Sequence, residues 1–360
     1  MQTKTTISSD SMTEQIFAKR LVNARKIRCL SQRELCDRLD GLVSSNAIAK
    51  YETGKMLPSS TVLIALARAL SLELDYFFRP FTISVDETKF EFRKKSSLNK
   101  KAENAVKEYA IMQIEKYLEI EQVTNDGRTF DIDYRSDIVH DSNDARALAN
   151  RLREDLELGI DGIPCPLEIL ENRGVKVIEV DADEKFDGSC VTDFEIPIII
   201  LNARITSERK RLTLFHELAH LILRFAEDVN VEALCNIFAN EVLLPSHVLK
   251  QLIGERRKNI SLVELKDIQR KYGISAEAIM VKAKQLGIIT ESCHRSFCIK
   301  QNTNEAFKDE VRKSVYPDEN ATRFKRIVYK ALSDDLITAS KAAMLLTISV
   351  DEVIEHVNVA

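Results

Sequence analysis

The chain has no apolar run of the roughly 18 residues that a membrane-spanning helix needs. Its first ten residues lack the apolar core of a secretory signal. The formal net charge is only −4, so the chain as a whole does not bind nucleic acid through general basicity. It has seven cysteines, an odd number with no regular spacing, which favours a reducing compartment over a disulfide framework. We therefore expect a cytoplasmic protein without a membrane segment.

What the chain does have is length and helical periodicity. Its 360 residues exceed one ordinary domain and suggest two or three. Hydrophobic residues make up 44% and charged residues 30%, as in soluble globular proteins. Apolar residues recur mostly at helical spacing, with a few short alternating segments. The predicted fold class is mainly α with a small β-sheet, that is, α+β.

One helical segment carries a His-Glu-x-x-His pattern. Residues 213–223 contain no Gly or Pro and are apolar on most sides, which predicts a largely buried helix. His216 and His220 are four residues apart, so two imidazoles one turn apart face the same ion. Glu217 lies on the next ridge, where a carboxylate takes a proton from water instead of binding the metal. Such a short pattern also arises by chance in ordinary helices.

A catalytic zinc site needs a third protein ligand and one open position. Glu232 opens a second apolar helix after the polar loop 224–230, and an antiparallel helix pair would return it to the histidines. Asn236 lies one turn further along the same face, where its side chain can hydrogen-bond a ligand histidine and fix its tautomer. Three other acids are rival third ligands: Glu241, then Glu227 and Asp228.

Three separated blocks, at 198–202, 211–220 and 232–245, resemble the ImmA/IrrE family of zinc metallopeptidases in order and spacing. The resemblance covers roughly residues 145–290. Cys235 stands where the family usually has a small alanine, a change that a short side chain should tolerate. The resemblance implies a zinc peptidase that cleaves a repressor protein and so relieves repression of phage, mobile-element or stress genes.

The N-terminal part predicts several short helices in about 65 residues. Ser31 and Glu34 have the spacing of a capping box, which starts a short helix. A turn containing Gly41 separates this helix from another beginning near Ser44, and residues 58–70 form a further helix. Short helix, tight turn and short helix form the layout of a helix-turn-helix.

Blocks at 31–35, 43–54 and 58–70 resemble the Xre/Cro-repressor family, with Leu42 as an extra residue in the turn. The resemblance places Gln32 against DNA phosphate and Ser45, Asn46 and Lys50 on the face that enters the major groove. The alternative is that these polar residues only form the solvated side of a small bundle. Residues 12–80 have eleven Lys and Arg against seven Asp and Glu, a local charge of +4 that leaves −8 on the remainder. This asymmetry favours DNA binding by this part alone.

The remaining segments complete the domain prediction. We expect β character at 81–92, a long helix at 99–122, strands at 175–180 and 196–201, and a C-terminal helical pair within 321–351. The strand at 196–202 is a candidate for pairing with an extended substrate. The predicted domains are a helix-turn-helix at 13–79, a linker with a long helix at 80–140, a metallopeptidase domain at 141–290 and a C-terminal helical domain at 291–360.

Two functions are compatible with this combination. The first is a DNA-binding regulator with a zinc-dependent endopeptidase that cleaves a repressor, either a partner or itself, with single-stranded DNA as a candidate activator. The second is a non-proteolytic transcription factor whose peptidase-like domain senses a ligand or DNA. A toxin–antitoxin role also fits. Repressor half-sites usually imply a dimer, so we expect a homodimer.

Overall fold

The computed structural model describes residues 9–79, 99–191 and 196–358. Within these ranges the chain is mostly helical and has one three-stranded sheet and one two-stranded sheet, which confirms the predicted α+β class. No helix among the described residues is both long and apolar enough to cross a membrane. The predicted β segment at 81–92 lies outside the described residues.

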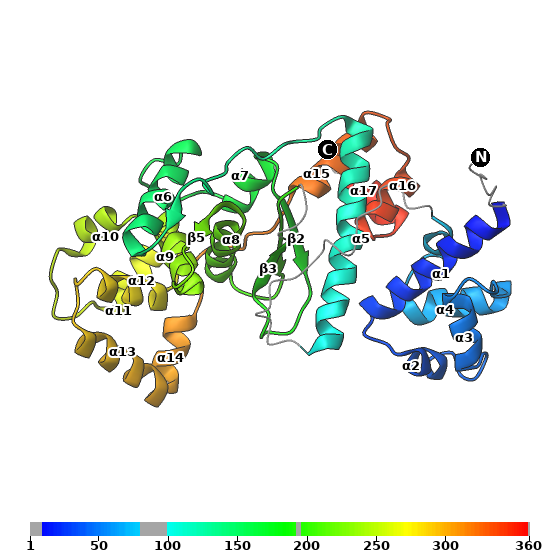
Figure 1. The fold of residues 1–360 in the computed structure, drawn as a ribbon, viewed down its shortest axis with the longest axis horizontal. Coiled ribbons are helices and arrows are strands. Elements are labelled where there is room, and N and C mark those ends of the chain that lie inside the picture. The colour runs from blue at the N-terminus through cyan, green and yellow to red at the C-terminus, as the bar shows by residue number, and fades with distance from the viewer. Residues whose placement is uncertain (1–8, 80–98, 192–195, 359–360) are drawn as a thin grey trace.

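The N-terminal helices form a small bundle, drawn in blue in Figure 1. They are α1 (Ser9–Ile27), α2 (Gln32–Asp37), α3 (Ser45–Glu52), α4 (Ser60–Leu70) and the 3-10 helix η1 (Leu74–Phe78). The predicted capping box is confirmed: the Ser31 hydroxyl accepts from the Glu34 amide, and Glu34 accepts from the Ser31 amide. Helix α1 begins at Ser9, four residues before the helix-turn-helix domain predicted at 13–79.

The long helix α5 (Lys100–Thr124) stands between the N-terminal bundle and the rest of the molecule (Figure 1). On one side it packs against α1, where Lys26 pairs with Glu108 at 2.5 Å and Arg20 with Glu115 at 3.2 Å. On its other side it contacts the sheet and the C-terminal helices. The predicted helix at 99–122 is therefore confirmed, with Asn99 as its N-cap.

The three-stranded sheet has the order β2-β4-β3. Strand β4 (Ile198–Asn202) is fully buried and runs parallel to β2 (Lys176–Val180) and antiparallel to β3 (Gly188–Val191). The expectation that β4 pairs with a substrate was wrong, because both of its edges are already hydrogen-bonded to neighbouring strands. Among the described strands, β3 is the edge strand nearest to the helix that carries the histidines.

Helix α8 (Ser207–Ile222) packs directly on β3 and β4, and α9 (Val231–Leu243) packs along α8. At Gly188 a Cβ would lie only 2.6 Å from Cγ2 of Thr213, so the absence of a side chain there lets α8 approach the sheet. The elements around this centre are α6 (Ser142–Asp155), α7 (Pro166–Asn172), α10 (Ser246–Ile253), α11 (Leu262–Tyr272), α12 (Ala276–Gln285), α13 (Glu291–Thr303), α14 (Glu305–Arg312) and a parallel pair, β1 (Ile138–Val139) with β5 (Arg224–Phe225).

The C-terminal segment returns to the sheet and to α5. Arg211 of α8 is fully buried and pairs with Glu319 at 2.6 Å. Arg323, also buried, pairs with Glu121 of α5 and donates to the Asp126 carbonyl oxygen. Helices α15 (Arg323–Ser333), α16 (Ala339–Leu346) and α17 (Val350–Asn358) then follow beside α5 (Figure 1).

Candidate metal centre and nucleic-acid interface

Helix α8 presents two imidazoles on one face. The His216 and His220 rings are 4.8 Å apart between centroids and nearly perpendicular, with their Nε2 atoms 3.2 Å apart. His220 lies deeper, with its side chain 2% exposed against 14% for His216. Two nitrogen lone pairs at this distance repel each other unless a proton or a cation lies between them. The two rings therefore either share a proton or hold a cation at this point.

A carboxylate from α9 completes the group. Oε2 of Glu232 is 3.2 Å from His216 Nε2, and Oε1 is 3.6 Å from His220 Nε2. Among the described residues, these three side chains form the group of potential metal ligands whose donor atoms all lie within 4.8 Å of one another. Ligands at about 2.0–2.1 Å from a tetrahedral zinc are roughly 3.3 Å from each other, so the observed separations fit that ion. Three donors also leave one tetrahedral position for water or substrate.

The neighbouring side chains of α9 orient both rings. Asn236 Oδ1 lies 3.0 Å from His216 Nδ1, and because this oxygen only accepts, Nδ1 carries the proton. Cys235 Sγ lies 3.2 Å from His220 Nδ1. In both rings Nε2 is thus the nitrogen that faces Glu232.

The contact of Cys235 was missed by sequence reasoning, which treated the residue only as a tolerated replacement for alanine. A signal was present in its position, because Cys235 is three residues after Glu232 and therefore shares its helix face. A thiol there adds a polar atom that alanine cannot supply. The structure brings it within hydrogen-bonding distance of the buried imidazole.

The rival acids lie elsewhere. Glu241 is buried and pairs with Lys282 at 2.5 Å, while Ser246 donates to it through its hydroxyl and its amide. Burial raises the pKa of Glu241, but the Lys282 ammonium and the Ser246 donors outweigh it, and the net pKa is below the usual value. Neither Glu227 nor Asp228 belongs to the three-ligand group. Glu217, only 8% exposed, adjoins His216 on α8.

The residues expected at DNA lie on the N-terminal bundle. Ser45, Asn46 and Lys50 are all exposed on α3. Gln32 is the first residue of α2, is half-buried, and donates to Glu52 Oε2 at 2.7 Å, which ties α2 to α3. The extra turn residue Leu42 is 47% exposed and so adds no bulk to the core between the two helices.

Both candidate sites lie on opposite sides of α5, as Figure 1 shows for α3 and α9. Residues 170–284 match a family described as the IrrE N-terminal-like domain, Peptidase M78. Residues 23–77 match a helix-turn-helix family. Comparisons with curated proteins and with solved structures gave no match. The two family matches show that this chain joins a helix-turn-helix DNA-binding domain to a domain of the IrrE N-terminal-like peptidase family.

Proposed function

We propose that the protein is a cytoplasmic transcriptional regulator whose peptidase-family domain is a zinc-dependent endopeptidase. Its substrate is a repressor protein, and cleavage relieves repression. The observation that carries the proposal is the convergence of His216, His220 and Glu232, with donor separations that fit a tetrahedral zinc. A site that only bound a structural ion would not need an open fourth position.

Each residue then has a defined role. His216 and His220 bind zinc through Nε2 and Glu232 through its carboxylate. Bound zinc supplies Lewis-acid chemistry, acidifying water and polarising a carbonyl group. The Glu217 carboxylate accepts the proton of the attacking water and delivers it to the leaving amide nitrogen. Asn236 holds His216 in the required tautomer.

A substrate segment has to lie extended beside α8. Strand β3 fits this role better than β4, because it is the edge strand and Gly188 brings it close to α8 one turn before His216. An extended peptide pairs with such an edge through backbone hydrogen bonds. The described part of the chain's own linker contains α5, a long helix with a buried apolar face, so a separate repressor is the simpler substrate.

The helix-turn-helix domain locates this activity on DNA. Ser45, Asn46 and Lys50 read the major groove from α3, and Gln32 contacts phosphate at the start of α2. Repressor-type operators have paired half-sites, so we propose that the protein binds as a homodimer. Single-stranded DNA is the activator to test first, because the proposed role is relief of repression under stress.

The proposal is tested by incubating the full-length protein with repressors encoded beside it, with zinc and with or without single-stranded DNA. Fragment masses are the readout. Glu217→Gln should retain zinc and lose cleavage by about 10²–10⁴-fold, the usual contribution of a general base. Glu227→Gln, an exposed loop acid, is the matched control and should cleave normally.

Two outcomes contradict the proposal. Cleavage by Glu217→Gln at the wild-type rate removes the assigned base. DNA binding and repression by the wild-type protein, with no fragment from any repressor or from itself, favours instead a non-proteolytic factor whose peptidase-like domain senses a ligand.

A further inference from the structure

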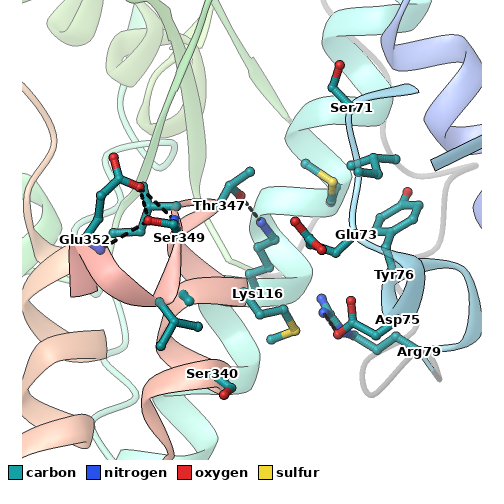
Figure 2. Close-up of a pocket in the computed structure, with 16 residues that line it drawn as sticks. Ser71, Glu73, Asp75, Tyr76, Arg79, Lys116, Ser340, Thr347, Ser349 and Glu352 are labelled. Atoms are coloured by element: carbon teal, nitrogen blue, oxygen red, sulfur yellow. Dashed lines mark hydrogen bonds and ion pairs between the residues drawn. The ribbon is translucent and has the colours of Figure 1, made fainter. Parts of the chain in front are cut away.

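A cavity of about 580 Å³ lies far from the candidate metal centre, where three parts of the chain meet. One wall is the end of the N-terminal bundle (71–79), the second is α5, and the third is formed by α16 and the start of α17. Figure 2 shows Lys116 of α5 extending towards Thr347, with Glu73 and Tyr76 of the N-terminal bundle on its other side. Ligand pockets commonly occupy about 300–1,000 Å³ and lie at such domain junctions.

Lys116 is a buried cation without a buried anion. The residue is 6% exposed, and its ammonium donates to Thr347 Oγ1 at 2.7 Å. Within the part of the chain that the structure describes, it forms no ion pair. The negative charge of Glu119 raises the pKa of Lys116, but Glu119 is itself paired with Lys341. Burial, together with the charges of Arg79 and Arg20, lowers the pKa of Lys116 to about 8.

The other buried lysines have stronger hydrogen-bond or ion-pair partners than Lys116 has. Three of them have a carboxylate partner at 2.5–2.7 Å: Lys176 with Glu121, Lys210 with Glu179, and Lys282 with Glu241. The remaining one, Lys266, donates to two backbone carbonyl oxygens, those of Val311 and Lys313. Lys116 alone among these five relies on one neutral hydroxyl. A desolvated ammonium with so little compensation is costly, and an anion beside it would remove that cost.

The rest of the cavity suits an anion with an apolar body. Next to Lys116 the walls carry the apolar side chains of Met112, Met344 and Ile348. The acids at the cavity are already engaged: Glu352 accepts from Ser349 through its amide and hydroxyl, and Asp75 pairs with Arg79 at 3.3 Å. Glu73 is exposed at the rim. Lys116 is thus the buried charged group of the lining, and the three acids of the lining are exposed.

The backbone conformation of Thr347 is a second observation that favours a ligand site. It ends α16 with φ of 59°, a left-handed conformation that is unfavourable for a β-branched residue. Backbone strain of this kind is retained where the surrounding structure requires it, often at ligand sites. Here it places the hydroxyl against Lys116, and because that oxygen accepts from the ammonium, its own proton remains available to an anion.

We propose that this cavity binds a small amphipathic anion whose head group contacts Lys116 and Thr347 and whose apolar body lies on Met112, Met344 and Ile348. Such an occupant touches the DNA-binding domain and the C-terminal helices together and links their positions. The proposal does not depend on peptidase activity. A carboxylate and a phosphate monoester share the required chemistry, and the two are distinguished by separate arms of the test.

The test uses the full-length protein and the fluorescent anion 8-anilinonaphthalene-1-sulfonate, displaced by octanoate in one arm and by octyl phosphate in the other. Lys116→Met keeps an unbranched side chain, one atom shorter, and removes the charge. It should weaken binding of the displacing anion by about tenfold or more, since hydrogen bonds to charged groups are the strong ones. Lys330→Met, an exposed lysine outside the cavity, is the control and should bind as the wild type does.

Circular dichroism shows whether Lys116→Met folds. If it does not fold, a second variant tests the proposal. Met344→Trp leaves the lysine in place and fills the apolar part of the cavity, and it should also prevent displacement by the octyl anions. Wild-type affinity in folded Lys116→Met, or in Met344→Trp, contradicts the proposal. Failure of both octanoate and octyl phosphate to displace the probe from the wild-type protein contradicts it as well.

Discussion

The α8–α9 pair and the α2–α3 pair carry the two candidate functions in opposite ways. In α8–α9 the functional side chains are turned inward, and each ring nitrogen that faces away from Glu232 meets a neighbour from α9. In α2–α3 the side chains assigned to DNA are turned outward, and Ser45, Asn46 and Lys50 are exposed. The first site is assembled by packing within the chain, whereas the second is completed only by a partner.

Because of this difference, folding alone fixes the geometry of the first site but not that of the second. The donor separations in α8–α9 already limit the ion and the open position, because folding fixes them. On α3 folding fixes only which residues face outward, and the base that each one reads depends on the DNA. Substitutions in the two regions should therefore differ in kind: changes at α9 alter stability or metal binding, and changes at α3 alter DNA affinity alone.

The largest expected effect lies at Glu241, the acid of α9 that does not belong to the metal group. Glu241→Gln leaves the buried Lys282 ammonium without its counter-charge. Breaking a buried pair in this way costs roughly 3–5 kcal/mol of the free energy of unfolding. Denaturant unfolding in the presence of a chelator measures this cost without a contribution from bound metal.

Glu232→Gln is the matched change on the same helix. Its carboxylate is 27% exposed, so the apo protein should lose little stability. The expected pattern is a large loss of stability with zinc retained for Glu241→Gln and the reverse for Glu232→Gln. An equal loss of stability in both variants would show that the two acids do not have the separate roles assigned to them.

A smaller effect is expected at Asn236. Removing the amide with Asn236→Ala frees the His216 ring and its tautomer, and loss of such a contact usually lowers metal affinity about 10–100-fold. Competition with a zinc chelator of known affinity measures the change. Unchanged zinc affinity, with the fold intact by circular dichroism, would mean that α8 positions His216 without help from α9.

The effect expected on α3 is no larger than that at Asn236 in order of magnitude, and it falls on DNA affinity instead of zinc affinity. Lys50→Ala should weaken binding to DNA from upstream of the protein's own gene by about 1–3 kcal/mol if the residue reads a base. If it contacts phosphate instead, the salt dependence of binding should decrease by about one unit of slope. Zinc content and unfolding should not change. Lys330→Ala on α15, outside the helix-turn-helix, provides the comparison.

Several local elements were predicted correctly from the sequence. The capping box at Ser31, the long helix after Asn99 and the buried strand around Ile200 were all predicted from patterns that local chemistry determines. Features that depend on tertiary packing were not predicted. The order β2-β4-β3, which closes both edges of β4, follows from how distant segments pair and not from the strand's own residues.

The same limit applies to the sites. Spacing on a helix predicted that His216 and His220 share a face, but several acids were open as the third ligand. The choice between Glu232 and Glu241 depends on Lys282 in a later helix, which attracts Glu241 into a separate buried pair. The cavity at Lys116 was not predicted, because its walls come from three separate segments, 71–79, 112–116 and 340–352, and the last lies more than 200 residues after the second.

The most direct test of the central claim is the zinc content of the purified full-length protein, measured by native mass spectrometry for the wild type and for Glu232→Gln. The account predicts one zinc ion per wild-type chain and little or none in the variant at the same protein concentration. Absence of zinc from a zinc-supplemented wild-type protein, or wild-type zinc content in Glu232→Gln, would contradict the assignment of His216, His220 and Glu232 as the metal ligands.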